Sequence, residues 1–426
     1  MNTQVLPKDK SLSRLIAKSP TVDNLCKSVL FKKFIELKHG SVTIEDRSVS
    51  PHKTEVFGDK AGRIHSKVVI HRSSFFSRTL LGGSIGNAES YVDGDWDSDQ
   101  LTDLVRLFVI NRDVLQGIDQ GIFSLVLGPV QKYFHGLRSN SLKGSRDNIR
   151  SHYDIGNDFF KLFLDETMMY SSGMFTDKTT SLNEASIKKI KKICDNLQLT
   201  PQDHLLEIGT GWGSLAIYAA QNYGCKVTTT TISKEQYNYA KEKIIALGLQ
   251  DKIELLFEDY RLLKGTYSKL VSVEMIEAVG LEHLETYFAK CSSLVAEEGI
   301  MVIQAITIRD HNYESAKKSV DFIQRHIFPG TGIPSITAMM NAITKKTNFV
   351  LADQKDYAED YAQTLHKWSQ NLKLEEQSIV KLGYPDFLHR LWQYYFSYCE
   401  GGFRERAIGL SHLTLTKPHY RNRSLI

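Results

Sequence analysis

The chain has 426 residues, of which 42% are hydrophobic and 24% charged, and its formal net charge at pH 7 is +4. This length exceeds one ordinary domain and predicts two, and the composition is that of a globular protein with a substantial core. A net charge this small gives no reason to expect nucleic acid as a partner.

The cysteine pattern and the lengths of the apolar runs indicate the cellular compartment of the protein. Five scattered cysteines without a CxxC pair argue against a disulfide framework or a zinc site and fit a reducing cytosol. The N-terminal MNTQVLPKDKSLSRL lacks the apolar core of a signal peptide. Since no run of about 20 apolar residues occurs, we expect no transmembrane helix and a cytoplasmic protein.

The first part of the chain predicts a small domain of mixed structure. Residues 66–70 (SKVVI) predict a strand and residues 101–110 a helix. The polar segment 138–150 (RSNSLKGSRDNIR) is typical of a linker. We therefore expect an α+β domain over residues 1–145 and a second domain over residues 146–426.

A helix is predicted to follow Ser181, which forms a capping box with Glu184. Apolar residues recur at helical spacing on one face: Leu182, Ile187, Ile190, Ile193 and Leu197. The other face carries four lysines: Lys188, Lys189, Lys191 and Lys192. Both a solvated surface and a contact with anionic lipid headgroups stay open for these lysines.

Short apolar runs then alternate with helices, which predicts a parallel sheet with helices on both faces. The predicted strands cover residues 204–208, 226–231, 253–257, 270–274 and 299–306, and the helices cover 215–222 and 234–247. This order indicates a doubly wound, Rossmann-like α/β domain, in which ligands bind at the carboxyl ends of the strands.

A glycine-rich turn follows the first of these strands, in the sequence EIGTGWG. Gly209, Gly211 and Gly213 let the backbone turn sharply and approach a ligand closely, although packing alone would also explain them. The spacing is GxGxG and not the GxGxxG of dinucleotide sites, and four threonines (228–231) stand where an NAD enzyme needs an acid. With Glu207 and Asp259 available for polar groups of the cofactor, S-adenosylmethionine fits best.

Several stretches in matching order resemble the cyclopropane-fatty-acyl-phospholipid synthase and mycolic acid methyltransferase family. They are SHYDIGNDFF (151–160), MYSS (169–172), EIGTGWG (207–213), TISKEQ (231–236), EDYR (258–261), SVEMIE (272–277), IFPG (327–330) and YCEGGF (398–403). The segment AESYVDGDW (88–96) also resembles the extra domain of bacterial lipid-modifying members.

The resemblance implies a reaction at an alkene. The cis double bond of an unsaturated phospholipid acyl chain takes a methyl group from S-adenosylmethionine, and the resulting carbocation loses a proton to close a cyclopropane ring. Aromatic side chains near the matched motifs offer π faces to such a cation. A methyl- or methylene-branched chain is the alternative product.

In the family a bicarbonate ion serves as the base, and the resemblance implies its holders here. They are Ser172, Glu277, Gln304, the backbone of Ile306, and Tyr361. The best-known bacterial pattern has Cys at the Ser172 position and His at the Gln304 position, so the anion site is altered and bicarbonate stays an open question. Cys399 stands where the family has a cysteine once proposed as catalytic, and a structural role for Cys399 is favoured because alkene methylation needs no covalent adduct.

The remaining matches imply cofactor contacts. Tyr170 and Ser171 resemble the family's contacts to the methionyl end of the cofactor. The ribose side is implied for Thr231, Ser233 and Gln236. The adenine side is implied for Asp259 and Tyr260.

A lipid substrate implies work at a membrane surface. Residues 308–336 interleave apolar and basic residues and suit an interfacial helix, although a helix packed on its own core fits equally well. We expect a protein bound peripherally to the inner face of the membrane, and a homodimer stays open. An oxygen or nitrogen methyltransferase would leave the matched HYDIGNDFF and FPG motifs unexplained. A catalytically silent lipid- or cofactor-binding protein stays open, because Ser172 and Gln304 depart from the family's Cys and His.

Overall fold

The computed structural model describes residues 20–115 and 155–421, and these form two compact units. Each unit is described here by itself. The linker predicted at 138–150, the boundary predicted near residue 145 and the first residues of the SHYDIGNDFF motif lie outside the described residues.

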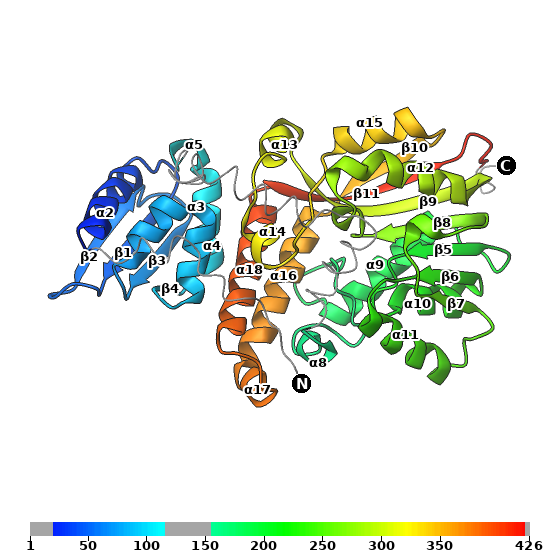
Figure 1. The fold of residues 1–426 in the computed structure, drawn as a ribbon, viewed down its shortest axis with the longest axis horizontal. Coiled ribbons are helices and arrows are strands. Elements are labelled where there is room, and N and C mark those ends of the chain that lie inside the picture. The colour runs from blue at the N-terminus through cyan, green and yellow to red at the C-terminus, as the bar shows by residue number, and fades with distance from the viewer. Residues whose placement is uncertain (1–19, 116–154, 422–426) are drawn as a thin grey trace. The chain divides into compact units, whose positions relative to one another are not determined.

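The first unit is an α+β structure built on a four-stranded sheet in the order β2-β1-β3-β4 (Figure 1). Only the β1–β3 pair is parallel. The strands are β1 (Ser41–Asp46), β2 (Lys53–Gly58), β3 (His65–Ile70) and β4 (Trp96–Ser98). The helices of the N-terminal part are α2 (Pro20–Ile35), α3 (Ser74–Val92), α4 (Leu101–Ile110) and α5 (Arg112–Leu115).

Two later stretches of the chain also belong to the first unit, so a single cut in the sequence does not divide the fold. They are residues 319–327 and 368–407. The second contains α17 (Glu376–Lys381) and α18 (Phe387–Arg404), and α18 packs on α3 and α4. α16 (Ala358–Leu374) begins in the second unit and ends in the first.

The segment expected to form an interfacial helix instead contains two short ones, α13 (Asp310–Ala316) and α14 (Phe322–His326). Phe322 is fully buried, with its ring centroid 4.9 Å from that of Tyr394, and Ile327 is also buried. These two side chains pack in the core of the first unit, which is the alternative that the sequence left open. The expectation of one interfacial helix is therefore wrong, because the segment forms two short helices and Phe322 and Ile327 are buried; contact of this segment with a membrane stays a prediction.

The second unit carries a seven-stranded sheet in the order β10-β11-β9-β8-β5-β6-β7 (Figure 1). The pairs from β9 through β8, β5 and β6 to β7 are parallel, and β10 and β11 add an antiparallel edge. The strands are β5 (His204–Ile208), β6 (Lys226–Thr230), β7 (Ile253–Leu256), β8 (Tyr267–Val273), β9 (Val295–Ile308), β10 (Val350–Asp356) and β11 (Ile408–Thr416). This confirms the predicted Rossmann-like fold.

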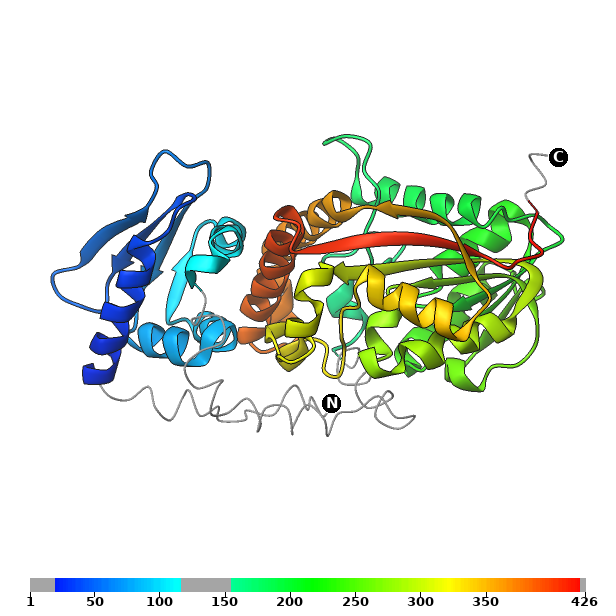
Figure 2. The same cartoon turned by 90° about the horizontal axis from the view of Figure 1, so that it is seen from above.

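Helices cover both faces of this sheet, as Figure 2 shows from above. One face is packed by α9 (Leu182–Asn196), α10 (Ser214–Tyr223) and α11 (Lys234–Ala246). The other is packed by α12 (Leu284–Leu294) and α15 (Ile336–Lys346). Strands buried on both faces read as continuous apolar runs, which is why the sequence revealed them.

The α9 helix has the predicted capping box, since Ser181 Oγ accepts from the Glu184 amide and the Glu184 carboxylate accepts from the Ser181 amide. Its two faces differ from the prediction at two positions. Lys189, expected in solvent, is only 1% exposed, whereas Ile187, expected in the core, is 39% exposed. The buried lysine therefore needs a polar environment inside the protein.

The strand order reverses between β5 and β8. The chain runs outward from β5 through β6 to β7 and then returns to place β8 on the other side of β5. In doubly wound sheets this switch point is where ligands bind, beyond the carboxyl ends of the strands. Here those ends lead directly into Gly209 after β5 and Glu274 after β8.

None of the described helices is long and apolar enough to cross a membrane.

Candidate active site

The glycine turn after β5 has the conformation that its sequence predicts. Gly209, Gly211 and Gly213 have φ values of 102°, 53° and 93°, which disfavour any residue with a Cβ. A Cβ on Gly213 would lie 3.2 Å from the Ala240 Cβ, so this glycine allows close packing of α11. A Cβ on Gly211 would meet nothing within 4 Å, so the backbone here leaves open space for a ligand.

Glu207, at the end of β5, is buried and accepts a hydrogen bond of 2.6 Å from Thr229 Oγ1. Burial raises the pKa of Glu207 to about 8, so at pH 7 it is mostly protonated. A neutral acid at this position can donate as well as accept. It can therefore position polar groups near the turn without adding a negative charge.

The end of β6 forms a second polar edge of the site. Thr231 Oγ1 lies 2.9 Å from Gln236 Oε1, and the Ser233 side chain caps α11 by accepting from the Gln236 amide. All three side chains are buried. The structure thus groups the residues predicted for the ribose side, and that role stays a prediction.

Asp259 follows β7 and is held by its neighbour Arg261. The guanidinium donates to both carboxylate oxygens, at 2.8 Å and 2.7 Å. Tyr260 packs edge-on against Tyr287, and burial raises the pKa of the Tyr260 phenol. Asp259 is therefore already paired, and contact of Asp259 and Tyr260 with adenine stays a prediction.

Aromatic rings pack beside the glycine turn. The Phe160 ring centroid is 5.0 Å from that of Trp212 and 5.2 Å from that of Tyr170. Trp212 Nε1 donates to Asn157 Oδ1 at 2.7 Å, which fixes the indole. Phe160 and Trp212 are buried and Tyr170 is half-buried, so an aromatic wall of these three side chains lies beside the glycine turn.

Beyond β8, four donors converge on the carboxylate of Glu274. Oε1 accepts from Ser171 Oγ at 2.8 Å, from the Ser172 amide at 3.3 Å and from Gln304 Nε2 at 2.6 Å. Oε2 accepts from the Tyr361 hydroxyl at 2.6 Å. Oε1 thus has three of the four donors and Oε2 has one, and a carboxylate oxygen has about two acceptor positions, so Oε2 can still accept a proton.

The backbone of Glu274 is also unusual. Its φ is 50°, in the left-handed region that side chains other than glycine and asparagine rarely adopt. The Glu274 amide donates to the Gln304 carbonyl at 2.8 Å, which holds the residue in this conformation. Strain of this kind collects at functional sites, because the surrounding structure must compensate for it.

A neutral histidine sets the direction of the Gln304 amide. Burial lowers the pKa of His412 to about 3, so the ring is uncharged and its Nε2 donates to Gln304 Oε1 at 2.8 Å. The Gln304 NH₂ group must then point the other way, toward Glu274 and Ser171 Oγ. His412 is thus a positioning residue for the donor to Glu274.

Glu277 lies deeper than Glu274. One oxygen accepts from the Ile306 amide at 2.5 Å, and the other has no hydrogen-bond partner among the described residues. Burial raises the pKa of Glu277 to about 8, and the nearby Glu274 carboxylate adds to the effect. At pH 7 Glu277 is therefore mostly an uncharged acid, whereas the side chain of Glu274 is only half-buried.

Lys189 supplies positive charge to this cluster. Its Nζ donates to Ser171 Oγ at 3.1 Å, and the Ser171 hydroxyl in turn donates to Glu274 Oε1. Burial lowers the pKa of Lys189 to about 8, but Glu274, Asp165 and Glu207 oppose this shift. The lysine is therefore still mostly a cation at pH 7.

Two residues predicted as catalytic are placed differently. Ser172 is fully buried, and its Oγ donates to the neighbouring Gly173 carbonyl at 2.9 Å. Cys399 lies on α18 in the first unit, whereas the other predicted catalytic residues belong to the second. Burial raises the pKa of the Cys399 thiol far above neutrality, so it is no thiolate nucleophile.

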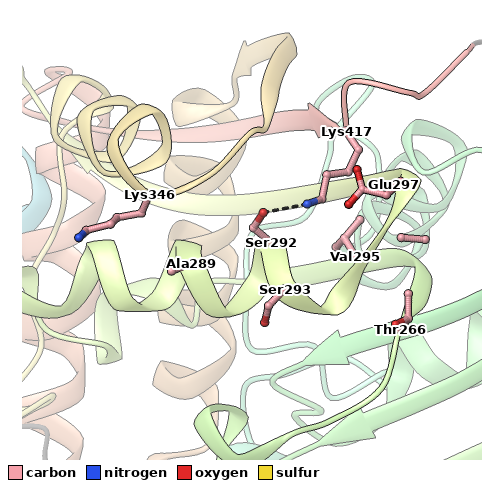
Figure 3. Close-up of a pocket in the computed structure, with 9 residues that line it drawn as sticks. Thr266, Ala289, Ser292, Ser293, Val295, Glu297, Lys346 and Lys417 are labelled. Carbon is pink, nitrogen blue, oxygen red and sulfur yellow. Dashed lines mark hydrogen bonds between the residues drawn. The ribbon is translucent and has the colours of Figure 1, made fainter.

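A surface hollow of the second unit lies elsewhere (Figure 3). Thr266 and Val295, which line it, stand at the starts of β8 and β9, and Lys417 Nζ donates to Ser292 Oγ beside them at 2.9 Å. Ligands of doubly wound sheets bind at the opposite ends of the strands. The hollow is therefore separate from the site at the glycine turn.

Sequence reasoning did not single out Glu274, Lys189 or His412 as site residues. A signal for Glu274 was present, since SVEMIE puts two acids three residues apart directly after a buried strand at the switch point. Lys189 and His412 gave no local signal, because a charged residue on a helix and a histidine in a strand are common on surfaces.

An open glycine cradle at the switch point with a buried acid before it fits an S-adenosylmethionine-dependent methyltransferase. Comparison with known proteins agrees. The model of the mycolic acid cyclopropane synthetase family matches residues 140–413. The chain belongs to this family.

Curated relatives cover most of the chain. It is 35% identical over 357 residues to the tuberculostearic acid methyltransferase UfaA1 of Mycobacterium tuberculosis, covering 82% of each chain. It is 32% identical over 367 residues to the cyclopropane-fatty-acyl-phospholipid synthase of Escherichia coli, covering 84% of this chain and 89% of that one.

A solved structure of a relative has a fold similar to that of this chain. The mycolic acid cyclopropane synthase CmaA1 complexed with SAH and CTAB has a TM-score of 0.60 and 26% identity, and covers 64% of this chain and 98% of that one. The cofactor of this protein is S-adenosylmethionine.

Proposed function

We propose that the enzyme adds a one-carbon unit from S-adenosylmethionine to the cis double bond of an unsaturated phospholipid acyl chain and closes a cyclopropane ring. The observation that carries the proposal is the convergence of a hydrogen-bonded carboxylate and an aromatic wall at the cofactor edge. Tyr170 of the wall directly precedes Ser171, which donates to Glu274.

This pairing suits a carbon acceptor. S-adenosylmethionine, when bound, supplies an electrophilic methyl group. An oxygen or nitrogen acceptor attacks through a lone pair and forms no carbocation, so it needs no cation-tolerant surface. An alkene becomes a carbocation, which aromatic faces stabilise and from which a positioned base must remove a proton from carbon.

A methylene-branched chain is the second candidate product, and the name of one relative favours it. This relative, 35% identical, is named a tuberculostearic acid methyltransferase. Ser172 and Gln304 replace the Cys and His of the best-known bacterial pattern, and this pairing resembles a branch that includes both plant-type cyclopropane synthases and enzymes making branched fatty acids, so it fits either product. The first carbocation is common to both products. The ring closes by loss of a proton from that cation, whereas the branch requires the cation to shift to the methyl-bearing carbon before a proton is lost.

The lipid must be reached from the membrane surface, and we propose that basic side chains dock the enzyme there. Lys188, Lys191 and Lys192 on α9 are exposed, and Lys191 also pairs with Asp195. Exposed lysines attract anionic headgroups by about 1 kcal/mol each near the surface.

The test is a transfer assay with methyl-labelled cofactor and the purified full chain. Vesicles would contain saturated or cis-unsaturated phospholipid, each with and without an anionic lipid. We expect label in the acyl chains of unsaturated vesicles, more with anionic lipid, and a ring or a branch identified by gas chromatography with mass detection. Equal labelling of saturated lipid, or no label in any acyl chain, would refute the proposal.

A further inference from the structure

The anion site that the family resemblance implies is already filled by the chain itself. The implied holders of bicarbonate are the side chains of Ser172, Glu277, Gln304 and Tyr361 and the backbone amide of Ile306. In this structure Gln304 Nε2 and the Tyr361 hydroxyl both donate to Glu274, each at 2.6 Å. Both donors therefore bind a side-chain carboxylate of the protein itself.

The remaining donors are also engaged. The Ile306 amide donates to Glu277 Oε1 at 2.5 Å, and Ser172 Oγ donates to the Gly173 carbonyl at 2.9 Å. A bicarbonate ion placed here would compete with an anion that is covalently attached and already has four donors. A hydrogen bond to a charged group contributes about 1.5–3 kcal/mol, so a free anion could bind these donors only by taking them from the half-buried Glu274 carboxylate.

We propose that the Glu274 carboxylate is the catalytic base of the reaction and takes the place of a bound bicarbonate ion. The inference rests on the proposed function, because it names the group that removes the proton from the carbocation. The carboxylate of Glu274 provides the same chemical group as bicarbonate, an oxygen anion held by an amide and a phenol.

The step balances without any further reactant. A C–H bond of the newly added methyl group breaks, and its electron pair forms the third bond of the cyclopropane ring. For a methylene branch, a hydride first migrates from the methyl-bearing carbon to the cationic one, and the electron pair of the methyl C–H bond then forms the double bond. The proton goes to Glu274 Oε2, and the positive charge of the acyl chain is lost with it. Because the Tyr361 hydroxyl can accept as well as donate, it can turn to accept from the new carboxylic acid, which later releases the proton to solvent.

The surroundings of Glu274 fit this role better than those of Glu277. Glu274 is half-buried and follows β8 at the switch point, next to the cofactor turn. Its left-handed backbone aims a side chain where the strand would otherwise continue. Lys189 balances the negative charge through Ser171, whereas Glu277 is buried and mostly protonated at neutral pH.

The first test compares wild type with Glu274→Gln and Glu274→Ala in buffer freed of carbon dioxide, with the labelled-cofactor assay on unsaturated vesicles. We expect the wild type to keep its full rate, and both variants to lose at least about a hundredfold, which is the scale of a lost general base. Added bicarbonate should restore activity to Glu274→Ala, whose shortened side chain vacates the site. Glu254→Gln, an exposed glutamate on β7, is the matched control and should keep the wild-type rate.

A second readout needs no turnover. Titration of the protein with ¹³C-bicarbonate, followed by NMR, should show binding to Glu274→Ala and none to wild type, while calorimetry should show equal cofactor affinity in both. A wild type that binds bicarbonate or needs it for activity, or a Glu274→Gln variant with a near-normal rate, overturns the inference. If the wild type methylates no lipid, the proposed function fails, and the titration still decides which anion fills the site.

Discussion

The ends of β5 and β8 lie side by side in the sheet, but they are built in opposite ways. After β5 the chain uses backbone alone, with glycines at positive φ and open space at Gly211. After β8 it uses side chains, with four donors around Glu274 and a buried lysine behind them. A side chain added at the first end would occupy the space left for a ligand. A change of charge at the second end would disturb the balance between Glu274 and Lys189.

The two strand ends therefore differ in function: the end of β5 would bind the cofactor, and the end of β8 would hold the reacting group. A backbone cradle accommodates a ligand through shape, so damage there should weaken cofactor affinity. A charge cluster holds a reacting group in place, so damage there should affect stability and turnover while affinity for the cofactor persists. Substitutions at the two ends can therefore be told apart by which quantity changes.

The largest effect is expected at the charge cluster, for Lys189→Met. Removing the cation leaves the Glu274 carboxylate without its buried counter-charge, and breaking such an arrangement costs about 3 kcal/mol or more of unfolding free energy. Denaturant unfolding at pH 7 measures it. Lys188→Met, one residue earlier on α9 and exposed, is the control and should change stability by less than about 0.5 kcal/mol. Equal losses in the two variants would mean that Lys189 does not serve the cluster.

At the backbone end, Gly211→Val should weaken cofactor binding by at least about a hundredfold, or roughly 2.7 kcal/mol. The new side chain fills the open space at the turn, and the φ of 53° adds strain. Calorimetric titration with S-adenosylmethionine measures the affinity.

Gly248→Val provides the matched control for this change. Gly248 also has a positive φ, 65°, and open space around its missing Cβ, but it follows α11 away from the turn. Both variants should lose similar stability, and only the Gly211 variant should lose affinity. If both bind the cofactor like the wild type, the cradle at Gly211 is not the cofactor site.

The sequence predicted the backbone end far better than the charge cluster. Strands buried on both faces and a glycine turn are local patterns, so β5 and Gly209 were visible without tertiary information. The cluster joins residues far apart in the chain, such as Tyr361 and Glu274, which are 87 positions apart. Lys189 was predicted in solvent because lysines are rarely buried without a partner, and its partners come from other segments.

The smallest effect is expected for Glu277→Gln, as a change in the pH dependence of stability. Burial raises the pKa of Glu277 from its ordinary 4.5 to about 8, so between these values the folded protein keeps a proton that the unfolded chain releases. The stability that this acid contributes is complete below the unfolded pKa and is lost as the pH rises through 8. The variant does not titrate there, so its unfolding free energy should rise relative to that of the wild type by on the order of 2 kcal/mol between pH 6 and pH 7.5. Glu207 shifts in the same direction but is present in both proteins, so its effect cancels in the difference. Unfolding curves at the two pH values measure this difference, and a constant gap would mean that Glu277 is ionised in the folded protein and shares the negative charge of the cluster with Glu274.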